Sequence, residues 1–120
     1  MKLTKTQRLI LYSLGQFYMS LNQPLTKKPL TLQTSKIMFI ELLVSSKIIT
    51  KQTRALYKNL ETLEKKKLIE YDNKKITFTE SGLIILEKIN SEVAKFVSIQ
   101  DYFVKTTKIG KRKLQTVIKS

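Results

Sequence analysis

Apolar residues recur at helical spacing in four stretches of this chain, and two short strand-like runs lie between the third and the fourth. The first stretch spans residues 4–21 and opens with Thr4 and Gln7, which have the spacing of a capping box. Its apolar residues recur in steps of three and four, which predicts an amphipathic helix. The stripe consists of Leu11, Leu14, Tyr18 and Leu21, widened by Ile10 and Phe17. We expect these side chains to pack in a core.

The helical pattern stops between residues 22 and 34, where two prolines and the pair Lys27-Lys28 predict a loop. Within it, Leu-Thr-Leu at 30–32 fits a short strand that would add a third strand to a small sheet. The loop is either a solvated connection or an additional contact to phosphate, and the sequence favours neither.

Residues 35–44, SKIMFIELLV, predict a second helix that is more apolar than a surface helix requires. Its apolar residues occupy two faces: Ile37, Ile40 and Val44 (with Glu41) on one, and Phe39 and Leu43 on the other. Core packing explains one face, and the other leaves contact with a second subunit open. Residues 45–49 follow as a turn, in which Ile48 or Ile49 would fill the core.

The third stretch predicts a helix over residues 51–66, with Thr50 as its N-cap. Leu56, Leu60 and Leu63 recur at i, i+4 and i+7 and therefore share one face. At about 100° per residue the opposite face is basic. It carries Lys51, Arg54, Lys58 and Lys65, whereas Gln52 falls nearer the apolar face and Tyr57 lies on the flank.

Two short strands follow, at Leu68–Tyr71 and Ile76–Thr79, joined by a turn at Asp72-Asn73. Lys74 and Lys75 place two positive charges at the tip of this hairpin. Thr79 is the predicted N-cap of a fourth helix. Gly82 lacks a side chain and so allows close packing against the start of that helix.

The run LETLEKKKLIEYDNKKITFTESG, residues 60–82, resembles the pattern L-x-x-L-E-x-x-G-L-I, wing, L-T-x-x-G of winged-helix transcriptional regulators of the MarR and PadR type. The resemblance covers residues 50–82 and is weaker elsewhere. It implies that 51–66 is a recognition helix, that 72–75 is a wing tip, and that the second helix stacks on the recognition helix. The family usually has Gly, commonly in a left-handed cap, where this chain has Lys67. A Lys in that conformation costs roughly 1 kcal/mol.

The fourth helix is predicted from Gly82 to about Phe103, and about 20 helical residues span about 30 Å, more than a small winged-helix body can cover. Its apolar stripe consists of Leu86, Ile89, Val93, Phe96 and Phe103, broadened by Ile85 and Ile99. A second copy of the chain would cover the distal half, which predicts a homodimer. The alternative is that the helix folds back on the first helix of its own chain.

The sequence therefore predicts a mainly α fold with a small β-hairpin (α+β), and it divides the chain into three parts. These are a winged-helix DNA-binding domain over 1–82, a dimerisation helix over 83–104, and a basic tail over 105–120. The tail has six basic residues and no acidic one. It is either a short ordered helix or a basic arm that orders on DNA.

Composition narrows the function further. The chain has 120 residues, no Cys and no His, which excludes disulfides, thiolate metal sites and the commonest general base. None of its 9 carboxylates forms a close pair in a Gly-rich or cleft-like setting, so we expect no enzyme, no metal and no cofactor. No apolar run approaches the roughly 18 residues of a membrane span. We expect no signal peptide in residues 1–16, because they lack an apolar core followed by a small-residue cleavage site. We expect a cytoplasmic, nucleoid-associated protein.

The net charge of +14, from 23 Lys and Arg against 9 Asp and Glu, predicts a polyanionic partner. The alternative is a lysine-rich surface that serves solubility or reflects biased coding. On double-stranded DNA, Lys51, Lys58, Lys74 and Lys75 are expected to contact phosphates. Arg54 would read guanine, Gln52 would read adenine, and Tyr57 would touch a sugar or a thymine methyl group.

These observations predict a dimeric, sequence-specific DNA-binding regulator. Two other classes remain open: a basic chromatin protein that coats DNA with little sequence preference, and a winged helix that binds proteins. The basic outer face of the third helix disfavours the protein-binding class. The three lysines at 65–67 are expected to be a solvated helix end, where positive charge offsets the helix dipole. The sequence names neither an operator nor a small-molecule effector.

Overall fold

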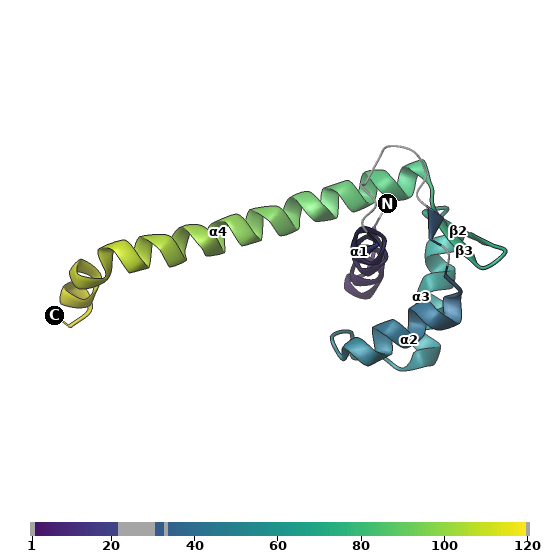
Figure 1. The fold of residues 1–120 in the computed structure, drawn as a ribbon, viewed down its shortest axis with the longest axis horizontal. Helices are drawn as coiled ribbons and strands as arrows, with labels where there is room; N and C mark the ends of the chain where they lie inside the picture. The colour runs from purple at the N-terminus through teal and green to yellow at the C-terminus, as the bar shows by residue number, and fades with distance from the viewer. Residues whose placement is uncertain (1, 22–30, 33, 120) are drawn as a thin grey trace. The chain divides into compact units, whose positions relative to one another are not determined.

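Helices make up most of the described part of the chain and are accompanied by a small antiparallel sheet. A computed structural model describes residues 2–21, 31–32 and 34–119. The elements are α1 (Lys5–Ser20), β1 (Thr31–Leu32), α2 (Lys36–Ser46), α3 (Thr53–Lys65), β2 (Ile69–Asp72), β3 (Lys75–Phe78) and α4 (Glu80–Lys119), shown in Figure 1. The predicted mainly α fold with a small hairpin is confirmed. The chain divides into two units, Met1–Ile89 and Asn90–Ser120.

Side-chain caps fix where the first two helices begin. Thr4 and Gln7 form the predicted capping box: the Gln7 N–H donates to the Thr4 hydroxyl at 3.2 Å, and the Thr4 N–H donates to the Gln7 side-chain oxygen at 3.1 Å. Ser35 caps α2 by accepting a hydrogen bond from the N–H of Met38 at 3.1 Å. α2 runs slightly beyond its predicted end at Val44 and finishes at Ser46.

The sheet has the strand order β1-β3-β2, and each neighbouring pair is antiparallel. Thr31 pairs with Thr77 and Leu32 with Ile76, so the predicted third strand is present. The remainder of the predicted loop, residues 22–30 with Lys27 and Lys28, lies outside the described residues.

The hairpin turn lies one residue further along the chain than the pattern predicts. Asp72 pairs with Lys75, so Asn73 and Lys74 are the two turn residues, with φ of 48° and 59°. Positive φ at both positions defines a type I′ turn, whose twist matches that of the flanking strands. The predicted turn at Asp72-Asn73 is therefore wrong, because Asp72 belongs to the strand ladder.

The core of the first unit is built around the apolar face of α3. Leu56, Leu60 and Leu63 are completely buried, as their spacing predicted. The core also contains Ile10, Leu11, Leu14 and Tyr18 of α1, Phe39, Ile40 and Leu43 of α2, Ile69, Ile76 and Phe78 of the sheet, and Leu83, Leu86 and Ile89 of α4. At the edge of the predicted α1 stripe, Phe17 is half-buried and stacks on Phe39 with ring centroids 6.5 Å apart. Leu21 is exposed, because it follows the last residue of the helix.

α2 buries only one of its apolar faces, which Phe39, Ile40 and Leu43 form. Ile37 and Val44 are exposed, so the predicted face that joins them to Ile40 does not pack in the core. The connection after α2 does contribute to the core, as predicted, through Ile49 rather than Ile48.

A left-handed residue ends α3. Lys67 has φ of 59°, its N–H donates to the carbonyl oxygen of Glu64 at 2.9 Å, and the Leu68 N–H donates to that of Leu63 at 3.1 Å. This pair of bonds is the Schellman motif, which satisfies carbonyl groups at the end of a helix. The left-handed cap that the family resemblance implies at this position is therefore present, with Lys in place of Gly.

The start of α4 is fastened to the end of α3. Thr79 donates its hydroxyl to the carbonyl oxygen of Lys67 at 2.6 Å and accepts from the N–H of Gly82 at 3.0 Å. A Cβ on Gly82 would lie 2.0 Å from the carbonyl oxygen of Leu68. The predicted Thr79 cap and the predicted close packing at Gly82 are both confirmed.

The helix that follows is longer than predicted, because α4 continues past Phe103 to Lys119. Leu86 and Ile89 are buried within the first unit, where the Leu86 side chain lies against Gly15. The prediction that both residues belong to a dimer face is therefore wrong. In the second unit Val93 is half-buried and Phe96 and Phe103 are exposed. Across the described residues, no helix combines the length and the hydropathy needed to cross a membrane.

Candidate nucleic-acid interface

The approach to α3 is set by a buried isoleucine. Ile49 is 7% exposed whereas Ile48 is 77% exposed, and the Lys51 N–H turns back to the carbonyl oxygen of Ile49 at 3.0 Å. This turn holds Thr50 outside the helix, so its predicted capping role is wrong. Gln52 is the N-cap residue, and no side chain caps the helix there. Gln52 is exposed at the helix start, although the helical pattern had placed it nearer the core.

α3 separates an apolar face from a charged face. Leu56, Leu60 and Leu63 lie in the core, and the exposed positions follow the same three- and four-residue steps on the other side. They are Arg54, Lys58, Glu61 and Lys65. The basic outer face that the sequence predicted is therefore open to solvent, and it also contains a carboxylate.

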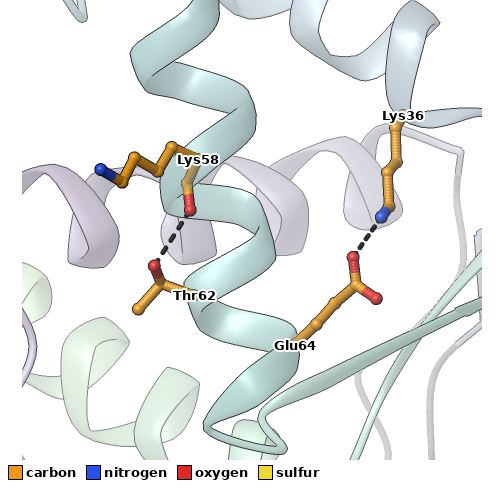
Figure 2. Close-up of polar contacts among 4 residues, drawn as sticks. All are labelled: Lys36, Lys58, Thr62 and Glu64. Atoms are coloured by element: carbon orange, nitrogen blue, oxygen red, sulfur yellow. Dashed lines mark hydrogen bonds and ion pairs between the residues drawn. The ribbon is translucent and has the colours of Figure 1, made fainter.

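Contacts with α2 and with the hairpin hold α3 in place. The Lys36 ammonium forms an ion pair with the Glu64 carboxylate and lies 4.7 Å from the centre of the Tyr71 ring. A partly buried ammonium between a carboxylate and an aromatic face links three elements through charge and cation–π attraction. Figure 2 shows the Lys58 side chain leaving α3 on a different side from this ion pair. Lys36 is therefore a structural residue, and Lys58 is free to meet a ligand.

The three lysines at the end of α3 have different roles. Lys66 is half-buried, and its ammonium donates to the carbonyl oxygen of Lys2 at 3.0 Å and to the Gln7 side-chain oxygen at 3.4 Å. It therefore ties the N-terminal segment to the end of α3. Lys65 and Lys67 are exposed at that end of the helix.

The hairpin tip presents two exposed lysines. In Figure 1 the turn between β2 and β3 projects beyond α1, α2 and α3 of the same unit. Lys74 is the second residue of this turn, and Lys75 begins β3 opposite Asp72 in the strand register. A lysine is an unusual choice for a position with φ of 59°, since Gly adopts this conformation without steric cost. The backbone cost and the exposed charge therefore coincide at Lys74.

The structure leaves six of the seven predicted DNA-contacting residues exposed and buries the seventh in part. The exposed residues are Lys51, Gln52, Arg54, Lys58, Lys74 and Lys75, and Tyr57 is half-buried on the flank. Sequence reasoning missed Glu61, although its spacing from Arg54 and Lys58 places it on the same helix face. It also missed the role of Lys36, since an ion pair between two helices depends on tertiary packing.

Other kinds of site have little support in the described part of the chain. No group of three or more metal-binding side chains occurs among those residues. An apolar groove of about 450 Å³ lies between α1 and α2, lined by Tyr12, Phe17 and Leu42 among others. Its two serine hydroxyls, those of Ser13 and Ser46, donate to backbone carbonyl groups of their own helices. The groove therefore offers apolar surface rather than a set of reactive groups.

Comparison with known proteins adds no family or fold assignment. No protein-family model, curated protein or solved structure matches this chain. The functional inference therefore rests on the residues described above: the exposed face of α3, the contacts that hold this helix, and the lysines at the hairpin tip.

Proposed function

We propose that this chain binds double-stranded DNA sequence-specifically, as a dimeric transcriptional regulator with a winged-helix domain. Residues 51–66 act as the recognition segment in the major groove, with α3 as its helical part. Residues 72–75 act as the wing on the DNA backbone or in the minor groove. The observation that carries this proposal is the exposed face of α3, where Arg54, Lys58 and Lys65 lie opposite a fully buried leucine face.

The order of elements in the first unit supports the proposal. Three helices with a short strand between the first two, then a hairpin, then a further helix, are what a winged helix requires, and the described residues follow this order. The continuous antiparallel register between β2 and β3, from Ile69–Phe78 to Asp72–Lys75, and the tight type I′ turn give the hairpin a defined shape. Such a hairpin can present the charges of Lys74 and Lys75 at a fixed place beside α3.

The proposed contacts divide into two kinds. Lys51, Lys58, Lys74 and Lys75 neutralise phosphates, which releases counterions and gives affinity without sequence information. Arg54 carries a planar guanidinium that can donate two parallel hydrogen bonds to guanine in the major groove. Gln52 is exposed at the start of α3 and can form the corresponding pair with adenine.

A second candidate is a DNA-coating protein with little sequence preference. The predominance of lysine over arginine on the exposed face of α3 and at the hairpin tip favours it, because a lysine ammonium binds phosphate as a point charge and fixes no base geometry. Arg54 and Gln52 favour the sequence-reading candidate. The two candidates differ in what happens when Arg54 is removed.

The test compares the affinities of three variants for two kinds of duplex: one selected for tight binding to the wild type, and duplexes of random sequence. Arg54→Ala is expected to relax preference at one base position and to weaken the selected site by about 1–3 kcal/mol. Lys74→Gly is expected to weaken both kinds of duplex alike, while relieving the strained turn, so that lost affinity cannot arise from unfolding. Lys88→Ala on α4 removes the same charge from an exposed position away from the proposed interface and serves as the control.

Salt dependence gives an independent measure. For the wild type, the logarithm of the association constant should fall with the logarithm of salt concentration by about 0.9 for each neutralised phosphate, and Lys74→Gly should reduce this slope by about one contact. Absence of binding to mixed duplex at low salt would refute DNA binding. If Arg54→Ala and Lys74→Gly each lose affinity equally on selected and random duplexes, the DNA-coating function is the candidate that remains.

A further inference from the structure

α3 contains two carboxylates, and they have different environments. Glu64 is half-buried and forms the ion pair with Lys36 that holds α3 against α2. Glu61 is exposed, and among the described residues its side chain takes part in no hydrogen bond or ion pair. Glu64 therefore has a structural role that the contacts explain, whereas Glu61 has none.

Glu61 lies in the middle of the basic face. At about 100° per residue, Arg54, Lys58, Glu61 and Lys65 fall within an arc of about 60° on one side of the helix. All four are exposed. A carboxylate on a surface that meets phosphates opposes binding through like-charge repulsion, so it weakens a face that serves only to coat DNA.

Helix stability gives only a weak reason for a carboxylate at this position. A negative charge stabilises a helix in its first turn, and Glu61 lies well inside α3, which begins at Thr53. Lys58 and Lys65 are three and four residues away, but exposed pairs of this kind contribute little. A glutamine would propagate the helix about equally well without the repulsion.

We infer that Glu61 reads a cytosine in the major groove, as a specificity-determining residue of the proposed DNA-binding surface. This inference rests on the proposed function. The N4 amino group of cytosine donates a hydrogen bond, which a carboxylate accepts, whereas guanine and thymine offer a carboxylate only acceptors in this groove. Glu61 therefore selects by repelling wrong bases as well as by bonding the right one.

The position of this cytosine follows from the helix geometry. Arg54 and Glu61 are seven residues apart in sequence, which corresponds to roughly 10 Å along the axis of α3. Base pairs are stacked about 3.4 Å apart, so a helix lying along the groove spans about three steps over that distance. The bound site should then contain a C·G pair about three steps from the guanine that Arg54 reads.

The experiment is selection of bound duplexes from a random library by the wild type, Glu61→Gln and Glu87→Gln. Glu87 is exposed on α4 in the first unit, so Glu87→Gln makes the same charge change away from α3. In Glu61→Gln the preference for cytosine at one position should fall roughly tenfold and shift towards adenine, which a glutamine side chain matches. Its affinity for random duplex should rise above that of Glu87→Gln.

Two results would overturn the inference, and they are distinguishable. If Glu61→Gln selects the same cytosine as the wild type, or if Glu87→Gln loses it equally, Glu61 does not read a base, while sequence-specific binding stands. If the wild type itself enriches no sequence, the inference fails together with the sequence-reading function. A loss of cytosine preference confined to Glu61→Gln supports the inference.

Discussion

Among the residues that the structure describes, three lysines adopt left-handed backbone conformations, with φ of 58° at Lys47, 59° at Lys67 and 59° at Lys74. A residue with a Cβ loses roughly 1 kcal/mol there relative to glycine. Lys67 ends α3 and Lys74 forms the hairpin turn, so two of the three lie beside the proposed DNA-binding surface. Backbone strain often accompanies function, and at Lys74 the exposed charge offers a reason for it.

Replacing Lys67 tests the cost of this conformation. Lys67→Gly should raise the free energy of unfolding by about 1 kcal/mol, because glycine adopts the left-handed Schellman position without a Cβ clash. Lys65→Gly is the control: it lies in the last helical turn, where the same substitution should lower stability by about 0.5–1 kcal/mol. Urea denaturation of both variants measures the difference. Equal destabilisation by the two substitutions would contradict the left-handed assignment at Lys67.

At the scale of elements, α3 is held at several points along its length. Its start follows the turn at buried Ile49, its middle is buried by three leucines, and its end is joined to α4 through Thr79 and to α2 through the Lys36–Glu64 ion pair. A helix held in this way keeps its exposed side chains in fixed positions relative to the hairpin. Such preorganisation reduces the entropy lost on binding.

Gly82 tests the junction between α3 and α4. Gly82→Ala places a Cβ 2.0 Å from the carbonyl oxygen of Leu68, and backbone atoms must move to accommodate it. We expect a loss of stability of at least about 2 kcal/mol. Ser81→Ala, a neighbouring substitution at an exposed position of α4, should change stability by less than about 0.5 kcal/mol. Thermal or urea unfolding measures the stability of both variants. If Gly82→Ala is as stable as the wild type, Gly82 is not in close contact with the Leu68 carbonyl group.

Local patterns predicted the elements well, and tertiary contacts account for the errors. The helices, the Thr4–Gln7 capping box and the Thr79 cap depend on residues close in sequence. Thr50 has the chemistry of a cap, but burial of Ile49 keeps it outside the helix.

The dimer face shows a second limit of sequence patterns. The apolar stripe of the fourth helix has the same spacing throughout. The spacing therefore does not distinguish Leu86 and Ile89, which pack in the chain's own core, from Phe96 and Phe103, which are exposed. For the site, helix periodicity placed Arg54 and Lys58 on the exposed face, whereas the role of Lys36 required the packing of α2 on α3.

On the scale of the whole molecule, charge and exposed apolar surface point to two kinds of partner. The net charge of +14 favours binding of a polyanion to the basic surfaces of the protein. The second unit exposes a separate set of large apolar side chains on α4, including Phe96, Ile99, Tyr102, Phe103 and Val104. Protein–DNA interfaces are more polar than protein–protein interfaces, so a row of large exposed apolar side chains along a helix supports a protein partner, and a second copy of the chain is the simplest one.

The predicted dimer interface contains Phe96, which is 72% exposed, and Phe103, which is 61% exposed. A substitution of Phe96 tests it. Burying each side chain in a partner would contribute roughly 1.5–3 kcal/mol. A two-fold dimer would also bring two recognition helices to one face of the duplex, about one helical turn apart, so each half of an imperfect palindrome would add affinity. We expect sedimentation to show a dimer for the wild type and a monomer for Phe96→Glu, because a glutamate in that seam is buried without a partner.

The matched control for Phe96→Glu is Ser98→Glu, which adds the same charge at an exposed position about 200° around the helix and should leave the dimer intact. A wild type that stays monomeric at tens of micromolar would remove the dimer from the proposal. If Phe96→Glu remains dimeric, the interface lies elsewhere, and the exposed apolar residues of α2, Ile37, Met38 and Leu42, become the next face to substitute. For a monomeric wild type, the phosphate contacts of α3 would still give binding, but without the added affinity of a second half-site.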